Sequence, residues 1–336
     1  MLGAVCLCMP RTLFAKTKDD ASTRIVPVTS KAKLAKQLEK EFNLSEQDIH
    51  AALAQATFVP TIIERMERPY EALPYRKYRP LFVNQRLAKM GKQYLDKHRK
   101  VFRHAMHKYG VQPGIIAAIL GMETHYGRSR GHDRVLDALY TLSVGYPKRA
   151  TFFRKELGEF LLMAREEHMK PTSVLGSYAG AFGTTQFIPS SYRSYAVDAD
   201  GDGKRNVWDS PEDIIHSVAN YFHHHGWEHG KPVAYWLPEV PESPALRHIR
   251  RHTKQGIRDW QTVAWLRRHG LPSVPAMWHD DDRVTLIDFD TASGPATALV
   301  HYNFYVITRW NHSYDYAMAA TELAFMLGCQ ACKNRA

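Results

Sequence analysis

Residues 113–122 are an unbroken run of apolar and glycine residues, and the acidic residue Glu123 follows them directly. Pro113 is well tolerated in a first helical turn, so the run predicts a helix. On that helix Ile116, Ile119 and Glu123 share one stripe, at i, i+3 and i+7. The chain must therefore enclose this helix in its core and accommodate one carboxyl group there.

A carboxyl group on a core-facing stripe has two explanations. In the first, burial disfavours the ionised form and raises the pKa, so Glu123 stays protonated near neutral pH and acts as a general acid. In the second, Glu123 pairs with Arg128 or Arg130 and has no chemical role, because structural ion pairs also perturb carboxylates. Helical periodicity alone does not choose between them.

Helical patterns dominate the chain except in residues 231–300. Helices are predicted over 31–56, as a pair, over 83–109 and over 316–327. Residues 283–289 alternate as a strand does, and residues 302–307 form an apolar run typical of a strand. The expected fold class is mainly α (α+β), with a small β-containing lobe inserted between helical regions.

The chain of 336 residues is long enough for two or three packed subdomains. Residues 2–9 are apolar but far shorter than the roughly 20 residues that a membrane span needs, and they resemble part of a secretory leader. The predicted regions are a leader or disordered segment at 1–20, a helical region at 21–110, a core at 111–230, a small β-containing lobe at 231–300 and a return to the core at 301–327.

The composition is basic, with 45 Lys and Arg against 34 Asp and Glu, and the formal net charge is +11. Such a surface attracts polyanions, whether nucleic acid, lipid headgroups or an acidic polymer. The sequence contains no zinc-finger spacing and no aromatic signature of an RNA-recognition module. We therefore expect no nucleic-acid partner.

A second motif, at 176–192, combines glycines and small residues with a glutamine. Glycines let a backbone approach a ligand closely, while Ser177 and Gln186 supply hydrogen bonds. Alone, the same run is equally typical of a tight turn between packed elements. Together with the Glu-Thr-x-Tyr-Gly turn at 123–127, it forms a recognisable signature.

With this signature the sequence resembles the B-type membrane-bound lytic transglycosylases of bacteria, glycoside hydrolase family 103. The resemblance covers residues 78–320 and rests on motifs at 121–128, 139–149, 176–192, 217–221 and 303–313. It implies a lysozyme-like helical core at 111–230, with Glu123 as the catalytic acid. The family's substrate-groove residues match Tyr78, Arg149, Ser177, Gln186, Tyr221, Asn311 and Tyr316.

The sequence departs from the family at two positions near these residues. Trp310 stands where the relatives have Tyr, and His125 stands where Arg is common. Read from the residues alone, Tyr and Trp faces suit a groove for sugar rings, although core aromatics at helical spacing look the same.

The resemblance also implies a reaction on peptidoglycan glycan strands. Glu123 protonates the glycosidic oxygen between N-acetylmuramic acid and N-acetylglucosamine and then takes the proton of the muramic C6 hydroxyl, which leaves a 1,6-anhydro end. No second carboxylate of the kind ordinary glycosidases use is indicated. The alternatives are a hydrolytic muramidase with an unnoticed Asp, and a non-catalytic scaffold that binds the cell wall or calcium.

An acidic loop at 198–209 has the spacing of an EF-hand-like calcium site. Asp198, Asp200 and Asp202 occupy positions 1, 3 and 5, and glycine occupies position 6. Lys204 would contribute only its backbone carbonyl. Asp209 replaces the usual Glu at position 12, so Glu212 or Asp213 would close the site, and the resemblance favours Asp213. A solvated Asp/Gly turn is the alternative to a structural Ca²⁺.

The remaining expectations follow from this function. We expect no organic cofactor, a monomer, and peptidoglycan strands as the partner. The expected location is the periplasm, with attachment to the outer membrane through a lost or cleaved leader as one alternative.

Overall fold

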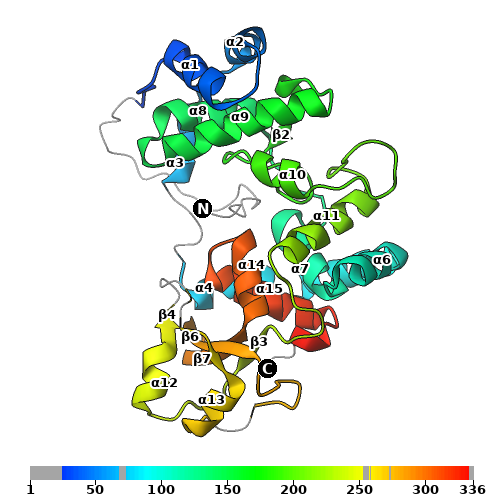
Figure 1. Cartoon of the computed structure of the whole chain (residues 1–336), viewed down its shortest axis with the longest axis vertical. Helices are drawn as coiled ribbons and strands as arrows, with labels where there is room; N and C mark the ends of the chain where they lie inside the picture. Colours follow the sequence, from blue (N-terminus) through cyan, green and yellow to red (C-terminus); the bar gives the residue numbers. More distant parts are fainter. Residues whose placement is uncertain (1–24, 68–72, 253–256, 258, 272–273, 333–336) are drawn as a thin grey trace. The chain divides into compact units, whose positions relative to one another are not determined.

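The computed structural model describes residues 25–67, 73–252, 257, 259–271 and 274–332 (Figure 1). The predicted leader at 1–20 lies outside the described residues. The chain forms two units, of which the first contains residues 73–126 and 210–332 and the second contains residues 25–67 and 127–209. The finer division into regions stays a prediction.

Helices make up most of the second unit. They are α1 (Lys31–Glu41), α2 (Glu46–Gln55), α3 (Pro60–Met66), α8 (Val135–Gly145), α9 (Ala150–Glu166), α10 (Pro189–Tyr195) and two 3-10 turns, η2 (Pro147–Arg149) and η3 (Pro171–Ser173). Strands β1 (Asp133–Arg134) and β2 (Leu175–Gly176) pair antiparallel. The predicted helix pair at 31–56 is confirmed.

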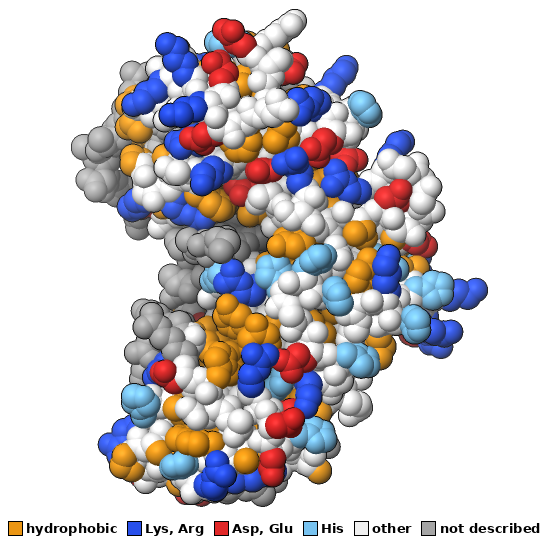
Figure 2. Space-filling view, viewed as in Figure 1, with side chains coloured by type: hydrophobic (Ala, Val, Ile, Leu, Met, Phe, Trp, Pro, Cys, Tyr) orange, Lys and Arg blue, Asp and Glu red, His pale blue; other side chains and the backbone are white. Residues whose placement is uncertain are grey.

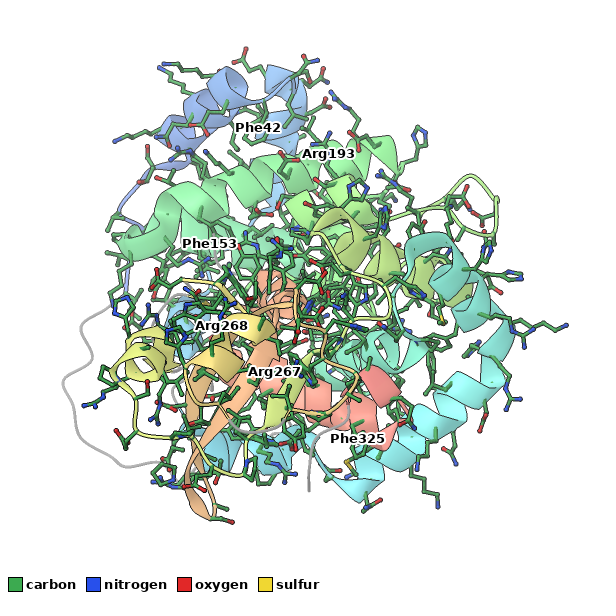
Figure 3. The ribbon with its side chains drawn as sticks, turned by 60° about the horizontal axis from the view of Figure 1, so that its bottom comes forward. Phe42, Phe153, Arg193, Arg267, Arg268 and Phe325 are labelled. Carbon is green, nitrogen blue, oxygen red and sulfur yellow. The ribbon has the colours of Figure 1, made fainter. Side chains whose placement is uncertain are left out.

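The helices of the second unit pack around α8, which is buried along its whole length. Helix α9 lies against α8, and α1 and α2 lie beside them (Figure 1). A glycine on α9 makes close packing possible, because a Cβ at Gly158 would be 2.2 Å from the ring of Phe42. Arg193 of α10 donates to Glu166 of α9 at 2.6 Å; Phe42 and Arg193 are labelled in Figure 3.

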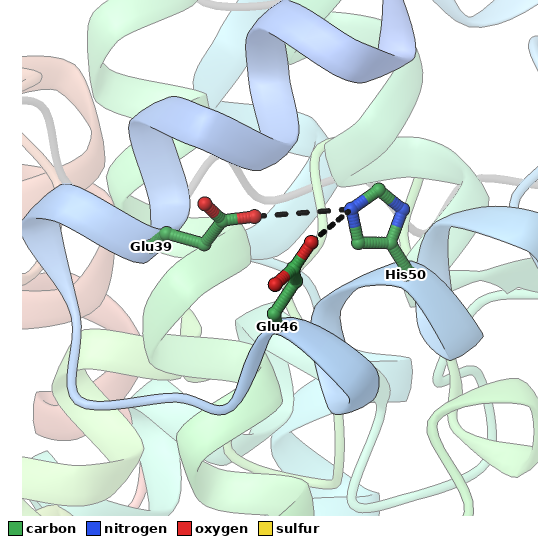
Figure 4. A group of neighbouring side chains, drawn as sticks. All are labelled: Glu39, Glu46 and His50. Atoms are coloured by element: carbon green, nitrogen blue, oxygen red, sulfur yellow. Dashed lines mark ion pairs between the residues drawn. The ribbon is translucent and has the colours of Figure 1, made fainter.

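An exposed charged group joins α1 to α2 (Figure 4). The Nε2 of His50 lies 3.8 Å from Oε1 of Glu39 and 3.9 Å from Oε1 of Glu46. Solvent-exposed pairs of this kind contribute about 0–1 kcal/mol. We interpret the group as surface ion pairs.

The first unit contains most of the remaining helices and the larger sheet. Its helices are α4 (Tyr75–Phe82), α5 (Gln85–Lys97), α6 (Arg99–Tyr109), α7 (Pro113–Thr124), α11 (Pro211–His224), α12 (Pro244–Ile249), α13 (Val263–Arg268), α14 (Tyr302–Trp310), α15 (Tyr314–Met326) and the 3-10 turn η4 (Gln330–Cys332).

The larger sheet lies within residues 234–301 and has the strand order β3-β7-β6-β4, with β5 on β6. Its strands are β3 (Ala234–Trp236), β4 (Arg250–His252), β5 (Gln261–Thr262), β6 (Arg283–Thr291) and β7 (Gly294–His301). Strands β6 and β7 form an antiparallel hairpin, and β4 runs parallel to β6. Leu286 and Leu299 on the hairpin and Leu266 on α13 belong to one buried cluster. The predicted strand at 283–289 is confirmed.

The prediction for residues 302–307 is wrong, because this segment begins helix α14. The side chain of His301 accepts the backbone N–H of Asn303 and caps the helix. Phe304 and Ile307 are both fully buried, at the i and i+3 positions of the helix. A largely apolar run of this length fits a helix as well as a strand, and the cap favours the helix.

The helices predicted over 83–109 are confirmed as α5 and α6, with His98 between them. Gly110 ends α6 in the left-handed conformation, with φ +74°, and Pro113 begins α7. This Gly-then-Pro arrangement fixes where α7 starts. The helix-dominated fold class is likewise confirmed.

Candidate active site

Helix α7 is surrounded by protein. Residues 114–124 are all buried, and Glu123, one residue before the helix ends, has no exposed surface. Burying an ionised carboxylate without partners is costly, so the groups around Glu123 determine its state.

Two side chains donate hydrogen bonds to one oxygen of Glu123. The indole Nε1 of Trp310 lies 3.0 Å from Oε1, and the hydroxyl of Tyr316 lies 2.7 Å from the same atom. Trp310 ends α14, and Tyr316 lies in the first turn of α15. In a neutral carboxyl group the acceptor oxygen is the carbonyl and the other oxygen carries the proton. With Oε1 as the acceptor, a protonated Glu123 would carry its acid proton on Oε2.

Aromatic rings on α11 hold the indole of Trp310 in place. The ring of Phe222 stacks on it at 5.5 Å, and the ring of Tyr221 meets it edge-on at 4.8 Å. The hydroxyl of Tyr221 donates to the backbone carbonyl of Arg309 at 2.5 Å. These contacts restrict the rotamer of Trp310 and so fix the direction of its N–H.

The chain turns sharply after Glu123. His125, Tyr126 and Gly127 all have positive φ angles, of 50°, 60° and 83°. Such angles are rare for residues other than glycine. The N–H of His125 bonds to the carbonyl of Gly121 at 3.0 Å. The same glycine makes room for the next ring, because a Cβ at Gly121 would be 2.6 Å from the hydroxyl of Tyr126. Burial raises the pKa of Tyr126.

Four of the predicted groove residues belong to the first unit. Tyr316 contacts the candidate acid directly, and Tyr221 contacts it through Trp310. Asn311 follows α14, and its Oδ1 accepts the N–H of Ser313 at 3.1 Å. Tyr78 on α4 is 1% exposed and packs against Phe82. The structure therefore brings Tyr316 into contact with Glu123 and Tyr221 into contact with Trp310, and Asn311 follows Trp310 in the chain.

The other three predicted groove residues belong to the second unit. Arg149, in η2, lies over the ring of Phe152 at 4.3 Å, and burial lowers its pKa. The hydroxyl oxygen of Ser177 accepts the N–H of Ala181 at 3.1 Å. Gln186 is fully buried and has a φ of 51°.

The amide group of Gln186 is held at one end only. Its Nε2 donates to the carbonyl of Gly183 at 3.0 Å and to that of Arg130 at 3.2 Å. Its Oε1 makes no hydrogen bond to any residue that the structure describes. A buried acceptor of this kind is costly unless a ligand or water supplies a donor.

The glycines around Gln186 have a packing role. A Cβ at Gly176 would be 2.2 Å from the carbonyl of Ala181, and one at Gly183 would be 2.7 Å from the side chain of Val207. The space at these positions is taken by the protein itself. Their absent side chains thus shape the loop that presents Ser177 and Gln186.

Three carboxylates of the acidic loop lie close together. One oxygen from each of Asp198, Asp200 and Asp202 lies within 4.8 Å of the others, and all three residues are exposed. The carboxylate of Asp198 also accepts the N–H groups of Gly201 and Gly203, at 2.7 and 2.8 Å. Oxygen atoms gathered in a turn are the ligands that Ca²⁺ prefers.

Two other residues were predicted as ligands of the same loop. Lys204 is exposed, and its N–H bonds to a carboxylate oxygen of Asp202 at 2.8 Å. Asp213 is fully buried in the first turn of α11, and its N–H is capped by the hydroxyl of Ser210 at 3.3 Å. Asp213 belongs to the first unit, and the acidic loop belongs to the second.

The sequence did not indicate two features near the site. Trp310 was noted as a departure from the family, but no spacing signal pairs it with Glu123. Asp315, next to Tyr316, is 7% exposed, and burial together with the charge of Asp290 raises its pKa to about 6. Its position in the first turn of α15 gave no sign of this burial.

Comparison of the chain with models of protein families identifies the family to which it belongs. Residues 28–325 match the family described as the transglycosylase SLT domain, which is most of the chain. The chain belongs to this family. The transglycosylase is also 37% identical over 298 residues to the membrane-bound lytic murein transglycosylase B of Escherichia coli K12, a match that covers 85% of this chain and 79% of that protein. It is a lytic transglycosylase.

Solved structures agree with this family. The transglycosylase matches the soluble lytic transglycosylase SltB1 of Pseudomonas aeruginosa with a TM-score of 0.80 and 38% identity, over 89% of this chain and 98% of that one. The lytic transglycosylase Slt35 of Escherichia coli, solved in complex with calcium, matches with a TM-score of 0.75 and 34% identity, over 90% and 94%. These neighbours confirm the lysozyme-like core.

One further solved structure contains a wall fragment. SltB3 of Pseudomonas aeruginosa, in complex with NAG-NAM-pentapeptide, matches the transglycosylase with a TM-score of 0.78 and 27% identity, over 90% of this chain and 79% of that one. Within the described residues of the transglycosylase, no helix is both long and apolar enough to cross a membrane.

Proposed function

We propose that the protein cleaves the β-1,4 bond between N-acetylmuramic acid and N-acetylglucosamine in peptidoglycan and leaves a 1,6-anhydro end. The observation that carries the proposal is Glu123, which has no exposed surface and accepts two hydrogen bonds on one oxygen. A buried carboxyl group whose second oxygen carries the proton is arranged to protonate a leaving oxygen.

One carboxyl group performs both proton transfers. Glu123 gives its proton to the glycosidic oxygen as the bond between that oxygen and the anomeric carbon breaks. The C6 hydroxyl of the muramic residue then bonds to the anomeric carbon, and Glu123 takes the hydroxyl proton back. The atoms balance without water, and the enzyme returns to its starting state.

The centre that forms at the anomeric carbon needs a partner that supplies electrons. Ordinary glycosidases use a second carboxylate for this purpose. Here we assign the task to the substrate's own acetamido group, which either Ser177 or Asn311 would orient. Trp310 and Tyr316 stabilise the carboxylate that Glu123 becomes after its first proton transfer, because charge-assisted hydrogen bonds are stronger than neutral ones.

The assignment of the groove residues remains part of this proposal. The buried Oε1 of Gln186 suits an N–H or O–H of the sugar or its acetamido group. The guanidinium of Arg149 is half-buried and suits an anionic group such as the muramic lactyl carboxylate or a peptide carboxylate. Tyr78 and Tyr221 are too deeply buried to offer a ring face to a sugar. They would support the residues that line the groove and would not contact the sugar themselves.

The decisive experiment is mass spectrometry of purified peptidoglycan digested by the wild-type protein and by Glu123→Gln. We expect anhydro-muropeptides from the wild type and none from the variant. The matched control is Glu322→Gln, because Glu322 is also buried and also accepts an indole N–H, from Trp236 at 2.9 Å. This control should retain activity.

The other outcomes identify the alternatives. Hydrated muramic ends would replace the transglycosylase reaction with a muramidase that uses water. Equal activity of Glu123→Gln and the wild type would remove Glu123 from the mechanism. A folded wild-type protein that binds peptidoglycan and releases no products would indicate a scaffold.

We further propose that Asp198, Asp200 and Asp202 hold a structural Ca²⁺, with the Lys204 carbonyl as a further ligand. Asp213 stays a ligand predicted from the sequence alone. The close approach of three carboxylates supports the site, because such a cluster is repulsive without a cation. The Slt35 relative was solved with calcium. The ion would stabilise the loop, and it has no part in the proton transfers.

We place the protein in the cell envelope, as a periplasmic monomer acting on the wall. Its relative in Escherichia coli is described as membrane-bound, which supports an envelope location. Fractionation of cells that express the full chain, followed by gel filtration, tests location and oligomeric state together. Recovery in the cytosolic fraction would contradict the proposal.

A further inference from the structure

Helices α5 and α6 carry a large part of the charge of the protein. Residues 85–109 contain one acidic residue, Asp96, and a net charge of +7, whereas the whole chain has +11. Eight Lys and Arg side chains supply this charge, and we call them the α5–α6 basic face. They are Arg86, Lys89, Lys92, Lys97, Arg99, Lys100, Arg103 and Lys108.

All eight cations of the α5–α6 basic face are exposed. The opposite side of the two helices is apolar and buried, with Leu87 on α5 and Phe102 and Ala105 on α6 facing the core. Arg99 pairs with Asp96 at 2.8 Å. The other seven cations form no ion pair with any described residue. The charge is therefore available to an outside partner.

The long helix α9, by contrast, mixes the two signs of charge. Helix α9 has Arg154, Lys155 and Arg165 among three glutamates, and Arg154 bonds to Glu41 of α1 at 2.8 Å. Figure 2 shows Lys, Arg and His side chains gathered at the edge where Figure 1 draws α6. Positive charges that lie this close together repel one another, and a bound anion reduces that repulsion.

A cavity of about 440 Å³ opens beside the basic face. Its lining combines the cations Arg99 and Arg103 with one carboxylate, Asp96, and with apolar side chains that include Phe102 and Leu327. An anionic group joined to an apolar chain matches this combination.

We propose that the α5–α6 basic face docks on an anionic phospholipid bilayer, with lipid phosphates at the cations. The residues favour a lipid surface over nucleic acid or glycan strands, because no exposed large apolar or aromatic side chain lies on these helices to stack on bases or sugars. The cations are spread over two helices on long side chains, which suits a fluid surface better than one rigid ligand. The inference does not depend on the proposed reaction.

The expected attachment is reversible and sensitive to salt. Each Lys or Arg close to an anionic bilayer strengthens binding about fivefold. The attraction decays over the Debye length, which is about 8 Å at physiological ionic strength. The protein should therefore leave the bilayer as salt is raised.

Co-sedimentation of the full chain with lipid vesicles tests the proposal. One set of vesicles contains equal parts of phosphatidylcholine and phosphatidylglycerol, and the other contains phosphatidylcholine alone. The test variant neutralises four lysines of the basic face: Lys89→Gln, Lys92→Gln, Lys97→Gln and Lys100→Gln. The matched control makes the same change in net charge elsewhere: Lys33→Gln, Lys36→Gln, Lys40→Gln and Lys155→Gln, all exposed and all in the second unit.

We expect the wild type to bind the anionic vesicles only. The test variant should lose more than about a hundredfold in binding, by the per-residue factor above, and the control variant several-fold at most. Thermal unfolding and peptidoglycan cleavage should be unchanged in both variants, because none of these lysines belongs to the candidate active site. Equal losses in the two variants, or wild-type binding by the test variant, would overturn the proposal.

A second measurement separates lipid from wall polymer. Purified peptidoglycan sacculi replace the vesicles in the same sedimentation assay. Loss of sacculus binding in the test variant, with no binding of the wild type to anionic vesicles, would assign the face to the wall and also overturn the proposal. Loss confined to the anionic vesicles supports it.

Discussion

The indole N–H of Trp310 donates to the carboxyl group of Glu123 across 187 residues of sequence. The contact joins the last residue of α14 to the buried end of α7. Tyr316, which follows a short turn after Trp310, reaches the same oxygen. The candidate acid is therefore positioned by two hydrogen-bond donors that lie six residues apart in the sequence.

Replacing Trp310 by Phe keeps an aromatic ring and removes its N–H donor. We expect kcat to fall about 10- to 100-fold, because a hydrogen bond to a charged group is worth about 1.5–3 kcal/mol. The alkaline limb of the pH profile should move to higher pH, since the ionised form of Glu123 loses a donor. Release of anhydro-muropeptides at several pH values measures both effects. Trp265→Phe, at an indole that stacks on His269, is the control.

Tyr316 and its neighbour Tyr314 allow a test of the second hydrogen bond to Glu123. Tyr316→Phe should lower kcat about as much as the Trp310 substitution, because it removes the 2.7 Å hydrogen bond to Glu123. Tyr314→Phe should leave kcat unchanged, since the hydroxyl of Tyr314 makes no hydrogen bond to a described residue. Equal kinetics for the two variants would show that the hydroxyl of Tyr316 has no part in the reaction.

Removal of calcium should lower the thermal stability of the protein. We expect Ca²⁺ to raise Tm by a few degrees over EDTA, because an ion that binds only the folded state stabilises it. The double variant Asp200→Asn, Asp202→Asn should lose this shift while each Asn retains an oxygen for its turn. Glu46→Gln, in the other acidic group, should keep it. An unchanged shift in the double variant would exclude the loop as the site.

The pH dependence of stability should reflect Asp315. Its pKa is raised from 3.8 to about 6 in the folded protein, so the folded state binds the proton more tightly than the unfolded state. The resulting stabilisation is complete below pH 4 and is lost as pH rises through 6. Asp315→Asn should therefore gain stability over the wild type at pH 7 or 8, by up to about 3 kcal/mol, and gain nothing at pH 4. Urea unfolding at both pH values measures this, with the exposed Asp96→Asn as control.

The sequence identified features that depend on local order along the chain. The apolar run before Glu123 could be recognised as a buried helix, because its start and its core-facing stripe lie within one segment. The carboxylate spacing of the acidic loop was equally local, and the structure brings Asp198, Asp200 and Asp202 together as that spacing predicts.

Features that depend on distant segments could not be predicted in this way. No periodicity places Trp310 or Tyr316 at Glu123, because the tertiary packing of α14 and α15 brings them there. The strand predicted at 302–307 failed because a short, largely apolar run does not separate a helix from a strand by its periodicity. The sequence left the glycines at 176 and 183 open between a ligand-facing loop and a tight packing turn, and the structure shows that they pack closely against Ala181 and Val207, respectively.

The two fixed ends of α7 determine the position of the candidate acid, Glu123, along the helix. Pro113 sets its first residue, and the left-handed turn at His125 sets its last. Each residue of an α-helix adds 1.5 Å and turns the next side chain by about 100°. Deleting one alanine, Ala117 or Ala118, would therefore swing Glu123 away from Trp310 and Tyr316 while preserving every residue of the site. The length of this helix is therefore constrained even at positions whose side chains do not touch the site.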